Sequence, residues 1–149
     1  MLSTYAQAGV KELCLRAQNE YGIDVLLLLM DAWLKKEKLA WPKQTELQAY
    51  LTWRKQMIVP LRALRMSLVK DDEPLRSQLL TAELSAEKNG VALLSAAQVV
   101  STTENIEHFL EKNFVFFNGA LDGSNQAAKA AASNNAQCFY ELFYKHLAI

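Results

Sequence analysis

The segment DVLLLLMDAWLKK, residues 24–36, decides the fold of this chain. From Val25 to about Lys36 almost every position is apolar, and a helix that is apolar on all sides is normally surrounded by other helices. With a rotation of about 100° per residue, the polar positions Asp24, Asp31, Lys35 and Lys38 fall on one side of this helix. We expect this side to be exposed to water, call it the wet stripe, and expect Asp31 to pair with Lys35 on it. The segment predicts an all-α fold, a compact bundle of about six or seven helices around a central apolar helix at about 25–36.

Helical spacing continues on both sides of this segment, and no stretch alternates at period two. Val10, Leu13, Cys14 and Ala17 follow an i, i+3, i+4, i+7 pattern. Gly22 is then expected as the residue with positive φ that ends this helix, and Asp24 as the N-cap of the next one.

Length and composition indicate one globular domain, residues 1–149. Apolar residues make up 51% and charged residues 21% of the 149 residues, which excludes disorder for most of the chain. Five Gly and three Pro are too few for an all-β sandwich with many tight turns. The net charge of zero argues against coating of nucleic acid by bulk charge.

The chain carries no sign of export or membrane insertion. The N-terminus has no basic, apolar signal pattern, and the longest apolar run, Val25 to Met30, is far shorter than the ~20 residues of a membrane span. We read Cys14 and Cys138 as reduced, buried thiols, with a redox pair as the alternative. These features predict a cytoplasmic protein.

The pattern from Glu46 to about Val69 is a long helix with an interruption. Pro60 cannot donate a hydrogen bond to the Gln56 carbonyl, so the helix should kink or restart there. After an acidic turn, a further helix starts at Leu75 and either ends near Gly90 or continues past it.

Signals for metal or catalytic chemistry are weak. Glu104, Glu107, His108 and Glu111 cluster, but without the Glu-x-x-His spacing of di-iron bundles, so we interpret them as a solvated helix face. Nucleophile-elbow and glycine-rich phosphate-loop motifs are missing, and His146 is expected at a helix end. We therefore predict no catalytic residue, no metal site and no cofactor.

Asp31 offers the one enzymatic alternative. If the carboxyl were buried in its apolar helix, it could act as an acid or base. The chain would then be an enzyme or a small-ligand binder with a pocket near Asp31 and the tryptophans.

Charge is distributed unevenly. Residues 35–70 contain nine basic and two acidic residues, whereas residues 71–149 contain five basic and ten acidic residues. Arg and Trp are enriched at interface hot spots. We therefore expect a non-enzymatic interaction or adaptor module that docks a protein through a basic, Trp-bearing kinked helix at about 45–70. The candidate partner-binding residues are Trp53, Arg54, Lys55, Arg62 and Arg65.

Three alternatives use the same charges. The arginines could pair internally with acidic residues such as Glu83 and Glu87, which would make them part of the scaffold. The same face could bind RNA or the ribosome, because arginine beside aromatic residues also suits RNA. Opposite charges on the two halves could join two copies into a homo-oligomer.

Several residue groups resemble a bacterial domain family of unknown function, over roughly residues 5–90. The N-terminal part of the resemblance consists of Gly9-Val10, Cys14-Leu15, Gln18, Gly22-x-Asp24-Val25, Leu27-Leu28-Leu29 and Trp33-Leu34. The middle part consists of Trp53-Arg54, Val59-Pro60-Leu61-Arg62-x-x-Arg65 and Ala82-Glu83-Leu84-x-Ala86-Glu87. Leu26 and Ala8 stand where members usually have Asn and Pro.

The resemblance implies a small all-helical cytoplasmic protein and brings no activity, ligand or catalytic residue with it. It marks positions for testing, which are Asp24, Trp33, Trp53, Arg54, Arg62, Arg65, Glu83 and Glu87. We expect capping by Asp24, packing by Trp33, and a buried or interfacial ion-pair network from the others.

Overall fold

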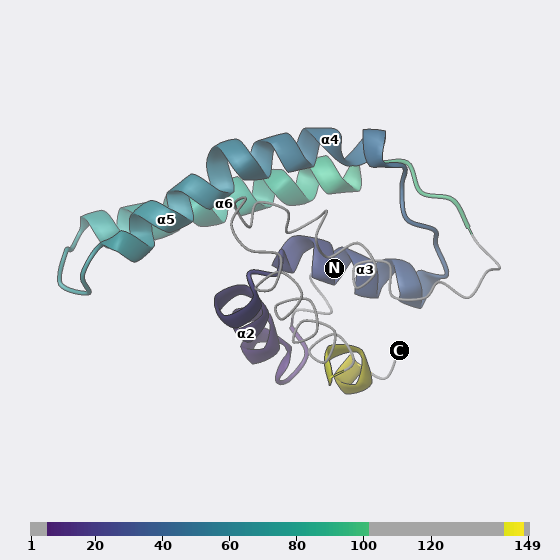
Figure 1. Ribbon diagram of the computed structural model, residues 1–149, viewed down its shortest axis with the longest axis horizontal. Helices are drawn as coiled ribbons and strands as arrows, with labels where there is room; N and C mark the ends of the chain where they lie inside the picture. Colours follow the sequence, from purple (N-terminus) through teal and green to yellow (C-terminus); the bar gives the residue numbers. More distant parts are fainter. Residues whose placement is uncertain (1–5, 102–141, 148–149) are drawn as a thin grey trace, which may run out of the picture. The chain divides into compact units, whose positions relative to one another are not determined.

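The computed structural model describes residues 6–101 and 142–147 (Figure 1). These residues are helical and contain no strand, apart from an isolated antiparallel bridge between Leu39 and Ser101. The all-α prediction is therefore confirmed for this part of the chain. The molecule divides into two compact units, Met1–Trp41 with Val100–Ile149, and Pro42–Val99. The organisation as one domain stays a prediction.

The first unit begins with α2, Val10–Tyr21, and α3, Val25–Glu37. Gly22 ends α2 with a φ of 63°, in the left-handed region that favours glycine. Asp24 begins α3, and its carboxylate accepts from two N–H groups of the first turn at 3.0 and 3.3 Å. Both predicted junction residues are confirmed.

Helix α3 is buried over most of its length, and of the four positions of the expected wet stripe Lys38 is exposed and Lys35 half-buried, whereas both carboxylates are buried. Asp24 and Asp31 are only 5% and 3% exposed. Asp31 accepts hydrogen bonds from the indole of Trp41 and the hydroxyl of Tyr144. The wet-stripe prediction is therefore wrong for Asp31, because Trp41 and Tyr144, which lie further along the sequence, cover its carboxylate. The buried members of α3 are Leu27, Leu28, Leu29, Met30, Asp31, Ala32 and Leu34.

A helical turn at 142–147 joins the C-terminal region to the same unit. Phe143 and Tyr144 are buried in it and meet edge to face, with ring centroids 5.6 Å apart. His146 Nε2 lies 2.9 Å from the carbonyl oxygen of Ala8. His146, which was expected at a helix end, lies in this turn, and residues 102–141 before it lie outside the described ranges.

The second unit is a helical hairpin. Its first arm is continuous: α4, Gln44–Trp53, the π-helical segment η1, Arg54–Ile58, and α5, Val59–Ser67. Its second arm is α6, Leu75–Ser95, which continues past Gly90 and runs beside the first arm (Figure 1). The helix does not stop at Pro60: the backbone stays in the right-handed helical region through Ile58 and Val59, and the irregularity predicted there takes the form of a π-helical segment. Pro60 lies in the first turn of α5, directly after a π turn in which the Val59 N–H donates to the Arg54 carbonyl.

A coiled-coil-like pattern explains the pairing of the two arms. Many of the buried and half-buried positions recur at alternating intervals of four and three residues, as in a heptad seam, while the buried Tyr50 and Leu94 lie outside this spacing. On the first arm the seam positions are Leu47, Leu51, Arg54, Ile58, Leu61, Arg65 and Leu68, and on α6 they are Leu79, Glu83, Ala86, Gly90 and Leu93. The seam therefore holds charged side chains among apolar ones.

Within the described ranges no helix is both long and apolar enough to cross a bilayer. The candidate cluster Glu104, Glu107, His108 and Glu111, and also Cys138, lie outside these ranges.

Candidate functional site

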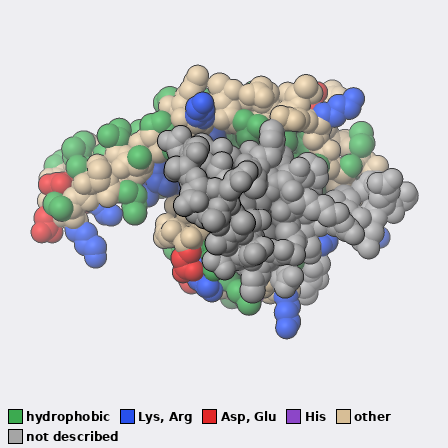
Figure 2. All heavy atoms as spheres, in the orientation of Figure 1, with side chains coloured by type: hydrophobic (Ala, Val, Ile, Leu, Met, Phe, Trp, Pro, Cys, Tyr) green, Lys and Arg blue, Asp and Glu red, His purple; other side chains and the backbone are tan. Residues whose placement is uncertain are grey.

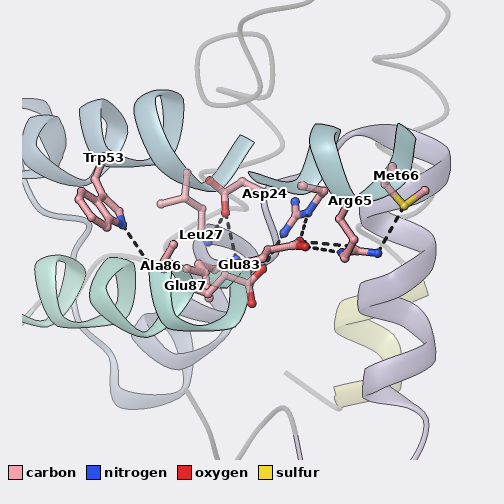
Figure 3. Close-up of polar contacts among 10 residues, drawn as sticks. Asp24, Leu27, Trp53, Arg65, Met66, Glu83, Ala86 and Glu87 are labelled. Atoms are coloured by element: carbon pink, nitrogen blue, oxygen red, sulfur yellow. Dashed lines mark hydrogen bonds and ion pairs between the residues drawn. The ribbon is translucent and has the colours of Figure 1, made fainter. Parts of the chain in front are cut away.

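An ion-pair network crosses the seam of the hairpin (Figure 3). Glu83, 3% exposed, accepts from Arg62 Nε at 2.7 Å and from Arg65 Nε at 2.5 Å. Arg65 Nη2 approaches the same carboxylate at 3.4 Å, and Arg62 Nη2 donates to Glu87 at 2.6 Å. One buried carboxylate thus holds two guanidinium groups between α5 and α6.

The network shifts the ionisation of its members. Burial alone would raise the pKa of the Glu83 carboxyl, but the hydrogen bonds from Arg65 and Arg62 outweigh it and place this pKa below its ordinary value of 4.5. The hydrogen bond to Glu83 raises the pKa of Arg65. Each charge stabilises the other, so the network is ionised at neutral pH.

Two further predicted partner-binding residues also lie within the hairpin. The indole Nε1 of Trp53 donates to the carbonyl oxygen of Ala86 at 2.9 Å, and Figure 3 shows the ring directed at α6. Arg54 is half-buried at a seam position. Lys55 is exposed. Of the five predicted residues, four therefore contribute to the inside of the hairpin and one faces solvent.

The outer surface of the hairpin is rich in exposed apolar side chains. The pair Arg62–Glu87 marks one side, which we call the Arg62 flank. Helical spacing places Val59 and Met66 on the same side of α5 as Arg62, and Leu80 and Leu84 on the same side of α6 as Glu87. These four side chains are 40%, 60%, 44% and 49% exposed.

The opposite side, the leucine flank, is apolar along both helices. On α5 and the segment next to it, this flank comprises Met57, Leu61, Leu64 and Leu68, at intervals of four, three and four residues, and on α6 Leu75, Leu79 and Ala82. Leu64 is 56% exposed, Leu75 is 50% and Met57 is 39%. Figure 2 shows hydrophobic side chains gathered over α5 and α6, with acidic ones at the turn.

Sequence reasoning missed these surfaces because it treated the segment at about 45–70 through its charges and its tryptophan, and did not separate the apolar positions that face α6 from Met57 and Leu64, which do not. A heptad count would have separated them, since neither falls on the seam that contains Ile58, Leu61 and Arg65. The same count would have placed Arg65 inside, because it takes a seam position between leucines.

Asp31 lies in a closed polar cluster in the first unit. Besides its bonds from Trp41 and Tyr144, the cluster includes Lys35, whose Nζ lies 5.0 Å from the centroid of the Tyr144 ring. The arrangement ties α3 to the segment after it and to the turn at 142–147. Its geometry is that of a structural junction.

Metal and thiol chemistry have little support in the described residues. No group of three or more His, Cys, Asp or Glu side chains is placed there to hold a metal ion. Cys14 is 2% exposed, and burial raises the pKa of its thiol to about 12. A buried thiol of this kind is an unreactive core residue.

Comparison with known proteins places the chain in a family. The model of the family described as "Protein of unknown function (DUF2390)" matches residues 1–94, which is more than half of the chain, so the protein belongs to this family. The matched region includes α2, α3 and nearly all of the hairpin. Neither a curated protein nor a solved structure shows significant similarity to the chain.

Proposed function

We propose that this DUF2390 protein is a non-enzymatic adaptor of the bacterial cytoplasm that docks a protein partner through its helical hairpin. In this proposal α3 is the central helix of the first unit, and the second unit presents the docking surface. The observation that carries the proposal is the exposure of large apolar side chains on both flanks of the hairpin, above all Leu64 at 56% and Met66 at 60%. Apolar patches of this kind on a helical surface are typical of protein-binding sites.

The internal ion pairs favour protein over RNA as the partner. RNA recognition needs cationic groups that reach phosphates and aromatic faces on which bases stack. Arg62 and Arg65 instead bind carboxylates, and the Trp53 indole binds a backbone carbonyl within the hairpin. What the two flanks offer to a partner is a set of exposed apolar side chains. Of the five predicted partner-binding residues, Lys55 is the one whose cationic group is exposed.

The internal bonds of Asp31 support the non-enzymatic side of the proposal. Its carboxylate accepts from two side chains of the same unit and is 3% exposed. A general acid or base must reach the proton of a substrate, and these bonds already use the carboxylate for packing.

The test compares the full chain with two variants as immobilised baits. One variant carries Leu64→Gln, Met66→Gln and Leu84→Gln on the flanks. The matched control carries Gln78→Ala and Asn89→Ala, two exposed polar positions of α6. We expect bound proteins to be retained by the wild type and the control and lost by the flank variant, with equal helix content by circular dichroism.

Two outcomes contradict the proposal. If the flank variant keeps the same bound proteins, docking does not use the hairpin. The second outcome is that ribonuclease abolishes binding and that the logarithm of the affinity falls steeply and linearly with the logarithm of the salt concentration. In that case the partner is RNA.

A further inference from the structure

Met66 is the most exposed of the three methionines that the structure describes, and its sulfur contacts the ion-pair network. It is 60% exposed, whereas Met57 is 39% and Met30 is 2% exposed. The Nη1 group of Arg65 donates to the Met66 sulfur at 3.6 Å (Figure 3). A thioether sulfur is only a weak hydrogen-bond acceptor. A strong donor is therefore directed at a weak acceptor that lies in contact with water.

Glu83 fixes the direction of this donor. The Nε and Nη2 groups of Arg65 bond to the Glu83 carboxylate at 2.5 and 3.4 Å, and Nη1 bonds to Met66 instead. A guanidinium group is planar and presents its donors in a rigid fork, so a carboxylate on one edge also orients the nitrogen outside that edge. A stronger acceptor at the position of the sulfur would meet a donor that is already in place.

We propose that Met66 is an oxidation site, at which hydrogen peroxide forms a methionine sulfoxide whose oxygen is held by Arg65. In the reaction the sulfur lone pair attacks one peroxide oxygen and the O–O bond breaks. The other oxygen takes up the proton of the first and leaves as water, so sulfur loses the two electrons that the peroxide gains. The sulfoxide oxygen is polar, and the weak bond to sulfur is replaced by a charge-assisted N–H···O bond.

The oxidation changes the chemistry of the Arg62 flank. Met66 has the largest exposed fraction of the four apolar side chains that define this flank. A sulfoxide converts this apolar side chain into a polar one, and a partner would have to bury it. Oxidation should therefore weaken protein docking, a consequence that rests on the proposed function of the hairpin.

The first experiment measures where peroxide reacts. The full chain is treated with hydrogen peroxide at neutral pH, and sulfoxide formation at each methionine is followed by peptide mass spectrometry. Met66 should react at least roughly 1.5-fold faster than Met57, in proportion to their exposed fractions of 60% and 39%. Met30, at 2% exposure, should react only as fast as the protein opens. Oxidation of Met57 before Met66 overturns the proposal.

The second experiment tests the role of Arg65, with two variants that both keep this arginine. In Met57→Leu the exposed thioether of the hairpin is Met66, and in the matched control Met66→Leu it is Met57. The arginine Nε–H resonances are recorded by ¹H–¹⁵N NMR before and after peroxide. Oxidation should shift the Arg65 resonance in Met57→Leu and leave it in place in Met66→Leu. An unshifted Arg65 resonance in oxidised Met57→Leu shows that Arg65 does not hold the sulfoxide, and overturns the proposal.

The third experiment uses the same two variants as immobilised baits, each compared with itself before treatment and after removal of the peroxide. Oxidation should reduce the bound protein about tenfold in Met57→Leu and by less than about twofold in Met66→Leu, because only the first gains a polar group on the Arg62 flank. An equal effect on both variants overturns the consequence for docking.

The outcomes separate this inference from the proposed function. If oxidation leaves capture unchanged while the flank variant loses its bound proteins, docking by the hairpin stands and the effect of Met66 oxidation on it is wrong. If the flank variant keeps its bound proteins, the proposed function fails. The mass spectra and the Arg65 resonance then still decide whether Met66 is an oxidation site held by Arg65.

Discussion

Replacing Glu83 by alanine should destabilise the hairpin by about 3 kcal/mol, because removal of one member of a buried ion pair typically costs about 3–5 kcal/mol. The Glu83 side chain is 4% exposed, and those of Arg62 and Arg65 are 22% and 15% exposed. The arginines can reach some water, and Arg62 keeps Glu87. The expected cost therefore lies at the low end of the range.

A variant without these three charges distinguishes the destabilisation caused by an unpaired charge from the net contribution of the ion-pair network to stability. The triple change Arg62→Met, Arg65→Met and Glu83→Leu leaves no buried charge without a partner. Glu87, 28% exposed, turns to solvent. Because well-packed apolar replacements of buried ion pairs are often neutral, we expect this variant to lie within about 1 kcal/mol of the wild type.

Native-state hydrogen exchange of the α6 amides measures the free energy of opening in the second unit alone, even if the whole chain does not unfold in two states. The decisive comparison is how the wild type and the two variants rank by this free energy of opening. The reasoning is refuted if Glu83→Ala leaves the opening free energy unchanged, or if the triple variant is less stable than Glu83→Ala.

The pH dependence gives an independent reading of the same network. The pKa of Glu83 is lower in the folded chain than its ordinary value of 4.5, so the unfolded chain binds more protons in this range and stability rises with pH. The stabilisation contributed by the ionised Glu83 is complete above about pH 4.5, and it is lost as the pH falls through the lower pKa that Glu83 has in the folded chain. Glu83→Gln should lack this part of the acid destabilisation, and equal acid profiles for both proteins would contradict the assignment.

Three predictions concern the first unit. In a Cys138→Ser background, Cys14 should react with a thiol reagent only as fast as the protein unfolds, because its thiol is buried with a pKa of about 12, and fast labelling at neutral pH would disprove this. Gly9→Ala should destabilise by about 1–2 kcal/mol, measured by urea unfolding, because the residue has a φ of 80° and a Cβ there would lie 3.0 Å from the His146 ring. Asp24→Ala should cost about 1 kcal/mol through the loss of the α3 cap, while Asp24→Asn should cost less.

Local chemistry made the helix boundaries predictable. Gly22 and Asp24 act on backbone groups within a few residues, and Pro60 acts on the turn that precedes it. Each effect depends on neighbours in the sequence, so residue type and spacing are sufficient to assign it.

The contacts that define the sites depend on distant residues. Asp31 receives its bonds from residues 10 and 113 positions away, and a helical wheel drawn for α3 alone leaves it in water. Pairing of the arginines with Glu83 spans 18 and 21 positions. Charge counts left internal pairing and external docking both open, because composition carries no information about which arm faces which.

The position of the ion pairs bears on the docking surface itself. A seam built only from leucine and alanine allows two helices to slip by a heptad at little energetic cost, whereas a charged group at one seam position fixes the register. Arg62 and Arg65 meet Glu83 at only one alignment of α5 with α6. This alignment also fixes which apolar side chains of α5 and α6 lie together on the leucine flank, so we infer that the network specifies the flank more than it stabilises the hairpin. The charge-free triple variant should then keep its stability but show more than one set of α6 amide resonances, one for each register of α5 against α6. A single set of resonances, as in the wild type, would show that the apolar seam alone determines the register.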